Sequence, residues 1–492
     1  MADLSQITLD SASSTPLYKQ LADSIRSLVS VGSLRTGERL PATRELAGQL
    51  GLNRTTVSAA YEMLEQSGFL QGHVGRGSFI AAAPEMHSFD WETVLPPLEH
   101  TPAPTAAVSI NFASSRPAAD SFPLEQFRQI SQQVIDSPEA AEILQLGSSH
   151  GYAPLRHYLL EQSRNSGVAR DTDDLIITNG CQQALDLIAR VFFDSATASQ
   201  SLLVEDPVYH GLLRVFLRAG ANIIGIPVDE AGLDLNAVED AIGRLHPRML
   251  VVTPSFQNPT GATLSLDRRK RLIEIAQRAG LILVENDIYS ELRYTGKPLP
   301  TLKQLDTSGN VILLRSYSKV SFPGLRVGWI VAPRPVIARL AGAKQISDLH
   351  SDQLSQAVLL RFAESGELAR HLTRSRDTGA ERLHAAMSAC SLHLPTGSTW
   401  TRPEGGMSLW VELPAPLLAE NVLARCEQRG VSYLAGPLFS SRDAHRRGLR
   451  LSFGGLAPQQ ITRGIQIMGE SAASELAAIR AEARLEPVAA VV

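Results

Sequence analysis

Apolar residues recur at helical spacing in the first eighty residues, and then in short runs separated by helical patterns. The first stripe consists of Leu17, Leu21, Ile25 and Leu28. It predicts a helix that closes at Gly32. Residues 38–70 predict a short helix, a turn at Gly51 and a second helix capped by Asn53. Residues 71–81 alternate like a β-hairpin, so we expect three helices and a β-wing within residues 12–80.

A proline-rich segment separates this block from the rest of the chain. Residues 81–109 hold five prolines among Ala, Ser and Thr, a composition typical of a semi-extended spacer. From residue 110 to 470, short apolar strands alternate with helical patterns, which indicates an α/β domain with a mainly parallel sheet and crossover helices. Residues 340–470 include a smaller C-terminal subdomain. Residues 471–492 are expected to form a last helix and a tail.

Composition narrows the class of protein. The 492 residues are 44% hydrophobic and 20% charged, with a net charge of −4, which is ordinary for a soluble globular protein of two or three domains. The three cysteines, Cys181, Cys390 and Cys426, have no metal-ligand spacing and argue against a disulfide scaffold. We expect a soluble, cytoplasmic protein, because residues 1–20 lack the pattern of a signal peptide and no apolar run has membrane length.

The second helix of the N-terminal block has the pattern of a DNA-recognition helix. Arg54, Thr55 and Ser58 project near its N-terminal end, opposite an apolar face. Arg76, between Gly75 and Gly77, marks the wing tip, where it suits a minor groove. The block carries as many acidic as basic residues, so charge alone leaves a protein-docking helical domain as the alternative.

Two runs in this block carry a resemblance to a known family. They are G-E-R-L-P-A-T-R-E-L-A, which contains Arg44, and R-T-T-V-S-A-A-Y-E-M-L-E-Q-S-G-F-L, which begins at Arg54. Residues 16–80 resemble the winged helix-turn-helix of GntR-type regulators. The resemblance implies that Arg44, Arg54 and the wing around Arg76 contact double-stranded DNA. At Ser58 some relatives place an arginine, so the phosphate contact there is expected to be weaker.

A second set of motifs predicts a cofactor site. Lys319, flanked by small hydroxyls in Ser316-Tyr317-Ser318-Lys319 and followed by Arg326, suits a Schiff base to an aldehyde cofactor that carries a phosphate. Pyridoxal 5'-phosphate (PLP) is such a cofactor. Ser316, Ser318 and Arg326 are expected to hold its phosphate.

Further candidates follow the predicted strands, where α/β sheets place their ligands. Gly180, Cys181 and Gln182 open a helix whose N–H groups suit a phosphate. Each of the other candidates has one expected role. Tyr209 stacks on the pyridine ring, Asn258 and Tyr289 bind its phenolic oxygen, Asp287 keeps its nitrogen protonated, and Arg450 grips a substrate α-carboxylate. Each motif alone also fits an ordinary turn or surface residue, but their joint occurrence in this order favours a PLP site.

Residues 108–470 resemble the class I aminotransferases of fold type I. Asn258, Asp287, Tyr289, Lys319, Arg326 and Arg450 match the cofactor and carboxylate positions of that family. The resemblance implies a homodimer with active sites at the subunit interface. One position departs from the family pattern: Leu146 stands where relatives have a tyrosine that reaches the neighbouring subunit's phosphate, and Tyr152 is out of register.

The whole chain is similar to the MocR subfamily of GntR-type transcriptional regulators, which joins these two parts. The leading hypothesis is a dimeric, PLP-dependent regulator that senses an amino compound as an external aldimine with the cofactor. Two alternatives remain: a working aminotransferase with an accessory DNA-binding module, and a regulator of vitamin B6 metabolism that senses PLP itself. The retained site residues leave open whether the chain is also an enzyme.

Overall fold

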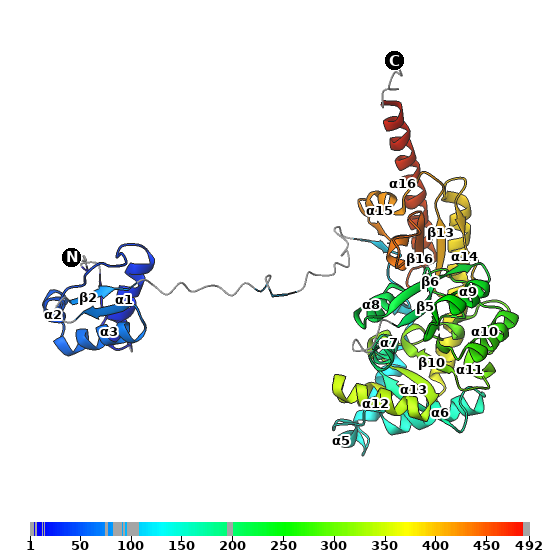
Figure 1. The fold of residues 1–492 in the computed structure, drawn as a ribbon, viewed down its shortest axis with the longest axis horizontal. Coiled ribbons are helices and arrows are strands. Elements are labelled where there is room, and N and C mark those ends of the chain that lie inside the picture. The colour runs from blue at the N-terminus through cyan, green and yellow to red at the C-terminus, as the bar shows by residue number, and fades with distance from the viewer. Residues whose placement is uncertain are drawn as a thin grey trace. The chain divides into compact units, whose positions relative to one another are not determined.

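The computed structural model describes residues 4, 7–11, 13, 15–73, 77–81, 91, 94–95, 108–193 and 200–485. The chain divides into two compact units, one within residues 1–102 and the other within residues 103–492 (Figure 1). Among the described residues, no helix combines the length and the apolar character needed to cross a membrane.

The N-terminal unit is a three-helix domain with a two-stranded wing. Its helices are α1 (Leu17–Ser30), α2 (Thr43–Leu50) and α3 (Arg54–Gln66), and its antiparallel strands are β1 (Leu70–His73) and β2 (Gly77–Ile80). The wing tip at residues 74–76, including Gly75 and Arg76, lies outside the described residues.

A small apolar core holds these helices together. Leu21, Ile25, Leu46, Val57 and Leu64 are fully buried between α1, α2 and α3. The turn between α2 and α3 requires a left-handed residue, and Gly51 supplies it with φ 65°. The side chain of Asn53 then caps α3 by accepting a hydrogen bond from the Thr55 N–H at 3.2 Å.

The second unit is built on an eight-stranded sheet of order β4-β11-β10-β9-β8-β5-β6-β7. The strands are β4 (Asp173–Thr178), β5 (Ser201–Asp206), β6 (Asn222–Asp229), β7 (Gly232–Leu233), β8 (Met249–Val252), β9 (Ile282–Asn286), β10 (Val311–Ser316) and β11 (Gly328–Pro333). Neighbours from β10 to β6 are parallel, whereas β11 is antiparallel to both β10 and β4, and β7 is antiparallel to β6. The mainly parallel α/β sheet expected from the sequence is confirmed.

Helices cover both faces of this sheet. One face packs on α7 (Gly180–Phe192), α8 (His210–Arg218) and α12 (Arg334–Asp348). The other face packs on α6 (Ala153–Asn165), α9 (Leu235–Leu245), α10 (Leu266–Ala279), α11 (Leu302–Leu305) and α13 (Gln353–Glu364). Strands buried on both faces read as continuous apolar runs, which is why β8 is Met-Leu-Val-Val. The short helices α4 (Leu124–Ile135) and α5 (Ala140–Ile143) precede α6.

A smaller subdomain follows, and it also includes a strand from the start of the unit. Its four-stranded sheet has the order β12-β13-β16-β15, formed by Thr399–Trp400, Ser408–Glu412, Gly448–Ser452 and Leu434–Ala435. The strand β14 (Val431–Ser432) pairs in parallel with β3 (Ile110–Asn111). The helices are α14 (Glu367–His393), α15 (Ala419–Glu427) and α16 (Pro458–Leu485).

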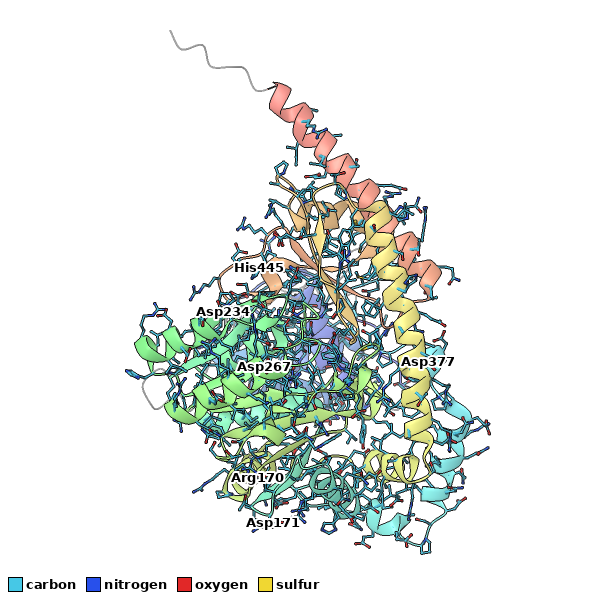
Figure 2. All side chains as sticks on the ribbon, turned by 90° about the vertical axis from the view of Figure 1, so that its right-hand side faces the viewer. Arg170, Asp171, Asp234, Asp267, Asp377 and His445 are labelled. Atoms are coloured by element: carbon cyan, nitrogen blue, oxygen red, sulfur yellow. The ribbon has the colours of Figure 1, made fainter. Side chains whose placement is uncertain are left out.

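Two long helices support the subdomain from one side. Helices α14 and α16 run along each other (Figure 2), with Ala386, Cys390, Ile465 and Met468 buried between them and the small sheet. Helix α16 is continuous from Pro458 to Leu485 rather than starting anew near residue 471, because its apolar positions continue unbroken across that point. His445, labelled in Figure 2, links the subdomain to the large sheet, since its Nε2 lies 3.0 Å from Oδ1 of Asp206.

Candidate cofactor and DNA-binding sites

The predicted cofactor residues follow strands whose carboxyl ends lie at one edge of the large sheet. Asn258 follows β8, Asp287 follows β9, and Ser316 ends β10. These three strands are parallel, so their carboxyl ends lie side by side. Gly180 follows β4 and opens α7 at the same edge. The connectivity of the sheet thus gathers motifs that are more than a hundred residues apart in the sequence.

A cavity of about 260 Å³ opens at this edge. All the predicted cofactor and carboxylate residues line it except Gly180 and Asp287, namely Cys181, Gln182, Tyr209, Asn258, Tyr289, Ser316, Ser318, Lys319, Arg326 and Arg450. Six further residues complete the wall: Ala113, Ser115, Leu185, His210, Asn286 and Ile288. Among the described residues no carboxylate lines this cavity, whereas one lysine and two arginines do, which favours an anionic ligand.

Lys319 presents its amine inside the cavity. It ends a 3-10 turn, Tyr317–Lys319, that follows β10 directly. Its Nζ donates a hydrogen bond to the Ser115 carbonyl and lies 5.9 Å from the centre of the Tyr289 ring. No carboxylate in the described part of the chain forms a salt bridge with this amine, so its partners leave it available to an aldehyde.

The serines and Arg326 form a compact donor cluster beside the start of α7. Ser316 Oγ lies 2.9 Å from Ser318 Oγ, and Arg326 Nη1 donates to Ser318 Oγ at 3.3 Å. Arg326 Nη2 donates to the Asn179 carbonyl at 3.2 Å. A Cβ on Gly180 would lie 2.5 Å from the Arg326 guanidinium, so only glycine allows this approach. Hydroxyl, guanidinium and helix N-terminus together suit a phosphate dianion.

Asp287 lies behind the cavity wall rather than in it. Its side chain is 1% exposed, and the residues on either side of it, Asn286 and Ile288, line the cavity. The chain leaves its extended path after Asn286 and enters the 3-10 turn Ser290–Leu292. Tyr289 therefore reaches the cavity through a turn rather than from the strand itself.

Arg450 and Asn258 hold each other in place at the opposite wall. Arg450 on β16 is 2% exposed, and its Nη1 donates to Asn258 Oδ1 at 3.1 Å. Its Nη2 donates to the Ala113 carbonyl, and the guanidinium lies 5.3 Å from the ring centre of Phe439. Burial lowers the pKa of Arg450 to about 10, so it remains a cation at neutral pH. Because Oδ1 of Asn258 is engaged, its amide N–H group is the one left for a ligand.

Several buried polar atoms of the wall have no hydrogen-bond partner among the described residues. They are Ser115 Oγ, His210 Nδ1, Asn286 Oδ1, Tyr289 Oη and Arg450 Nε. Such atoms are costly in a folded protein unless a ligand or water satisfies them. Their placement around Lys319 and the serine–arginine cluster fits a phosphorylated aromatic aldehyde with hydrogen-bonding ring substituents. The residues present therefore fit PLP.

Burial keeps three other wall residues neutral. It raises the pKa of Cys181 to about 12 and also raises that of Tyr209, so neither ionises near neutral pH. Burial, with the Arg450 charge, lowers the pKa of His210 to about 4. Around Lys319 the wall is therefore a set of neutral donors and acceptors with two fixed cations.

The sequence reasoning missed Ser115, His210 and Asn286. His210 and Asn286 are next to the predicted residues Tyr209 and Asp287 in the sequence. They would have been found if the neighbours of each residue predicted after a strand end had been included. Ser115 enters from the segment after β3 and belongs to no motif, so only the fold reveals it.

Four of the five predicted DNA contacts are exposed on the N-terminal unit, and the fifth, Arg76, lies outside the described residues. Arg44 on α2 and Arg54, Thr55 and Ser58 on the first turns of α3 are all exposed. On α3 they lie opposite the buried side chains of Val57, Ala60, Tyr61 and Leu64. The N-terminal end of α3 is thus free to enter a groove.

Comparisons with known proteins match each of the two units. Residues 17–80 match the bacterial regulatory proteins of the gntR family, and residues 108–467 match aminotransferase class I and II. The chain is 30% identical over 479 residues to "Probable rhizopine catabolism regulatory protein MocR" of Rhizobium meliloti, which covers 93% of this chain and 94% of that protein. It is also 34% identical over 373 residues to "Aromatic-amino-acid aminotransferase 1" of Thermococcus litoralis. That match covers 75% of this chain and 88% of the relative.

A solved structure matches the second unit. It is LysN, the alpha-aminoadipate aminotransferase of Thermus thermophilus, complexed with N-(5'-phosphopyridoxyl)-L-leucine. The TM-score is 0.71 at 35% identity, and the match covers 76% of this chain and 94% of that one. The second unit is therefore an aminotransferase-like domain of fold type I whose cofactor is PLP, and the first is a DNA-binding domain. The chain belongs to the MocR subfamily of GntR-type transcriptional regulators.

Proposed function

We propose that this protein is a homodimeric transcriptional regulator that senses a small amino compound at its PLP site. The observation that carries the proposal is the convergence of Lys319, the serine–arginine cluster and buried Arg450 on one cavity. The same chain carries a DNA-binding domain, so a compound bound in the cavity can change the affinity of the protein for an operator. Switching requires that the bound compound favour one arrangement of the DNA-binding domains over another.

When bound, the cofactor supplies an aldehyde carbon that bonds an amine and a ring that withdraws electrons. Lys319 would hold the cofactor through its amine. Arg450 would bind the carboxylate of an amino compound, with Nε as the free donor. Asn258 and Tyr289 would bind the phenolic oxygen of the ring, and Asp287 would bind the ring nitrogen. Ser316, Ser318 and Arg326 would hold the phosphate, and Tyr209 would cover the ring.

An exposed apolar surface supports the homodimer. Leu144, Leu146, Ile346 and Leu349 are 59–90% exposed on this chain. The segments that carry them are joined, because Gln353 Nε2 donates to the carbonyls of Ile143 and Gln145. A group of large exposed apolar side chains is typical of a surface that another subunit covers. Leu146 provides an apolar contact there in place of the tyrosine that relatives use toward the neighbouring phosphate.

The first test is a spectroscopic titration of the PLP-loaded protein with a panel of amino compounds, with and without a keto acid. We expect one class of amino acid to shift the visible band to a stable end point and to change operator affinity at the same concentrations. A band shift without any change in operator affinity would contradict the sensing function.

Replacement of Lys319 gives the first prediction. Lys319→Ala should remove the visible band of the cofactor–lysine linkage and the mass label that borohydride reduction leaves on the peptide containing residue 319. Lys270→Ala, at an exposed position of α10, is the matched control and should keep both signals. If Lys319→Ala kept the band and the effector response, the proposed role of this lysine would be wrong.

The second candidate function is aminotransfer, and the convergence of ten of the twelve predicted cofactor and carboxylate residues on one cavity favours it. In the same titration, an active aminotransferase converts fully to the pyridoxamine form and turns over a keto acid. The third candidate, sensing of PLP itself, predicts operator binding that responds to PLP but not to any amino acid.

A further inference from the structure

Arg315 lies directly behind the carboxylate of Asp287. The parallel register of β9 and β10 pairs Asn286 with Leu314, so the next residue on each strand is Asp287 and Arg315. Arg315 Nε and Nη2 lie 2.9 and 2.8 Å from the same oxygen, Asp287 Oδ2. The other carboxylate oxygen is left for a ligand.

Asp287 separates two cavities. A second cavity of about 310 Å³ is lined by Asp287, Glu291 and Arg315, and it shares Ile288 and Ser316 with the cofactor cavity. The Asp287 side chain is 1% exposed and that of Arg315 is 24% exposed, so the carboxylate is buried and the guanidinium is partly exposed. Arg315 thus approaches Asp287 from the side opposite the cofactor.

The carboxylates next to the pair have hydrogen-bonding partners of their own. Glu291 is engaged by Arg376 of α14 at 2.8 Å, and Glu285 of β9 accepts the N–H groups of Leu302 and Lys303. Arg315 is therefore the cation that hydrogen-bonds to Asp287, and within the described residues no other side chain does so. The Asp287–Arg315 pair has no net charge before any ligand arrives.

This neutrality has a consequence for the ring nitrogen. A buried carboxylate without a cation strongly favours a positive charge on its ligand, and a carboxylate that is already paired favours it less. A weakly protonated ring withdraws electrons less from the bond that must break in aminotransfer. The complex with an amino compound then persists instead of turning over.

We propose that Arg315 is a positioning residue that weakens the hold of Asp287 on a protonated ring nitrogen and thereby favours capture of an amino compound over its turnover. This inference rests on the proposed function, in which Asp287 faces the ring nitrogen. Because Arg315 also neutralises Asp287 in the cofactor-free protein, it lowers the affinity for the cofactor. Removal of the cation leaves a buried charge that only the ring can balance.

The test compares wild type with Arg315→Gln, which keeps a donor but loses the charge. Both are loaded with PLP labelled with ¹⁵N at the ring, and the ¹⁵N chemical shift is followed against pH. In Arg315→Gln we expect the ring nitrogen to titrate about one pH unit higher or more, and the cofactor dissociation constant to fall about tenfold. Arg376→Gln, a neighbouring arginine that binds Glu291 instead, is the matched control and should match wild type in both measurements.

One further variant, Arg315→Lys, tests the role of the charge. Arg315→Lys retains the charge, so in this variant the ring nitrogen should titrate at the same pH as in wild type. If its titration moved to higher pH as far as in Arg315→Gln, the charge argument would be overturned. An unchanged ¹⁵N titration in Arg315→Gln would do the same. If Arg315→Gln does not fold, Arg315→Lys still tests the proposal. A shift of its ring-nitrogen titration to higher pH, although the cation is retained, would contradict the proposal.

Asp287→Asn separates this inference from the proposed function. If Asp287 faces the ring nitrogen, that variant loses protonation of the ring at neutral pH. If the ¹⁵N signal of Asp287→Asn equals that of wild type, the proposed site arrangement fails, and not only the role of Arg315.

Discussion

Arg450 is the residue on which the proposed recognition of a carboxylate depends. It is buried, charged and held from three sides, by Asn258, by the Ala113 carbonyl and by the ring of Phe439. Its geometry is therefore set before a ligand binds, and Nε remains without a partner among the described residues. Preorganisation of this kind converts a hydrogen bond into affinity at little entropic cost.

Replacing Arg450 should separate amino-acid sensing from cofactor binding. In Arg450→Gln we expect the affinity for amino-acid effectors to fall by about 3 kcal/mol, or roughly a hundredfold. The lysine-linked visible band should remain. Spectroscopic titration measures both, and Arg446→Gln, on the exposed segment before β16, is the control. An unchanged amino-acid affinity would remove Arg450 from the site, while a response to PLP alone would favour the B6-sensing alternative.

Glu205 makes the stability of the second unit depend on pH. Its carboxyl lies in the sheet, 1% exposed, and accepts a hydrogen bond from the Thr253 N–H at 3.1 Å. Burial raises its pKa from 4.5 to about 8. The folded state therefore binds a proton that the unfolded state releases between these two values. The stability that this proton provides is complete below about pH 4.5 and is lost as the pH rises through about 8.

In Glu205→Gln we expect this part of the pH dependence to disappear. The free energy of unfolding should fall less steeply than in wild type between about pH 5 and 8. Urea unfolding at several pH values measures the slope, with the exposed Glu364→Gln as control. Parallel curves for wild type and Glu205→Gln would show that Glu205 titrates normally.

At the scale of elements, α3 combines a buried face with an exposed one. Four side chains, from Val57 to Leu64, fix it to the domain core, and its first turn carries Arg54, Thr55 and Ser58 outward. The Asn53 cap fixes where the helix begins and therefore where these three side chains point. Gly51 sets the angle between α2, which carries Arg44, and α3.

This arrangement predicts how DNA affinity responds to salt. Arg54→Ala should weaken binding to all sequences if the residue contacts phosphate, and should reduce the slope of log K against log salt by about 1. Ser58→Arg should steepen the slope by a similar amount. Fluorescence anisotropy over a range of salt concentrations measures both. Arg26→Ala is the control, because Arg26 binds Asp23 and Ser67.

At the scale of the molecule, each unit has its own hydrophobic core. Leu21, Ile25 and Val57 belong to the first core, and the large sheet with its two helix layers and the small subdomain form the others. The two units therefore need not fold together, and the proline-rich segment 81–109 sets how far apart they can act. In a homodimer, two DNA-binding domains then share one operator.

Separating the units should lower operator affinity without abolishing DNA binding. A chain ending at residue 81 should bind an operator with two half-sites about a hundredfold more weakly than the full protein, since the second contact is no longer intramolecular. Affinity for a single half-site should be nearly unchanged. Gel-shift titration on one-site and two-site DNA measures the difference. If the chain ending at residue 81 and the full protein bound two-site DNA with equal affinity, this result would argue against the dimer.

Much of this architecture could be predicted from the sequence, because it is written in local patterns. The periodicities of 3.6 and 2 predicted the N-terminal helices and the alternation of strands and helices. The order of motifs predicted PLP, and most of the predicted residues line one cavity. Strand-end motifs carry this information because parallel strands bring their carboxyl ends together.

Only the tertiary structure decided the contacts between distant segments. The carbonyl of Ser115 meets Lys319, Arg450 fixes Asn258, and Arg315 stands behind Asp287. These contacts arise from strand order and register, which bring together residues that no local pattern relates. By itself the sequence determined which elements form and which chemistry they carry. The packing of those elements decided which charges are paired and which donors remain free, because that balance depends on every neighbour in space.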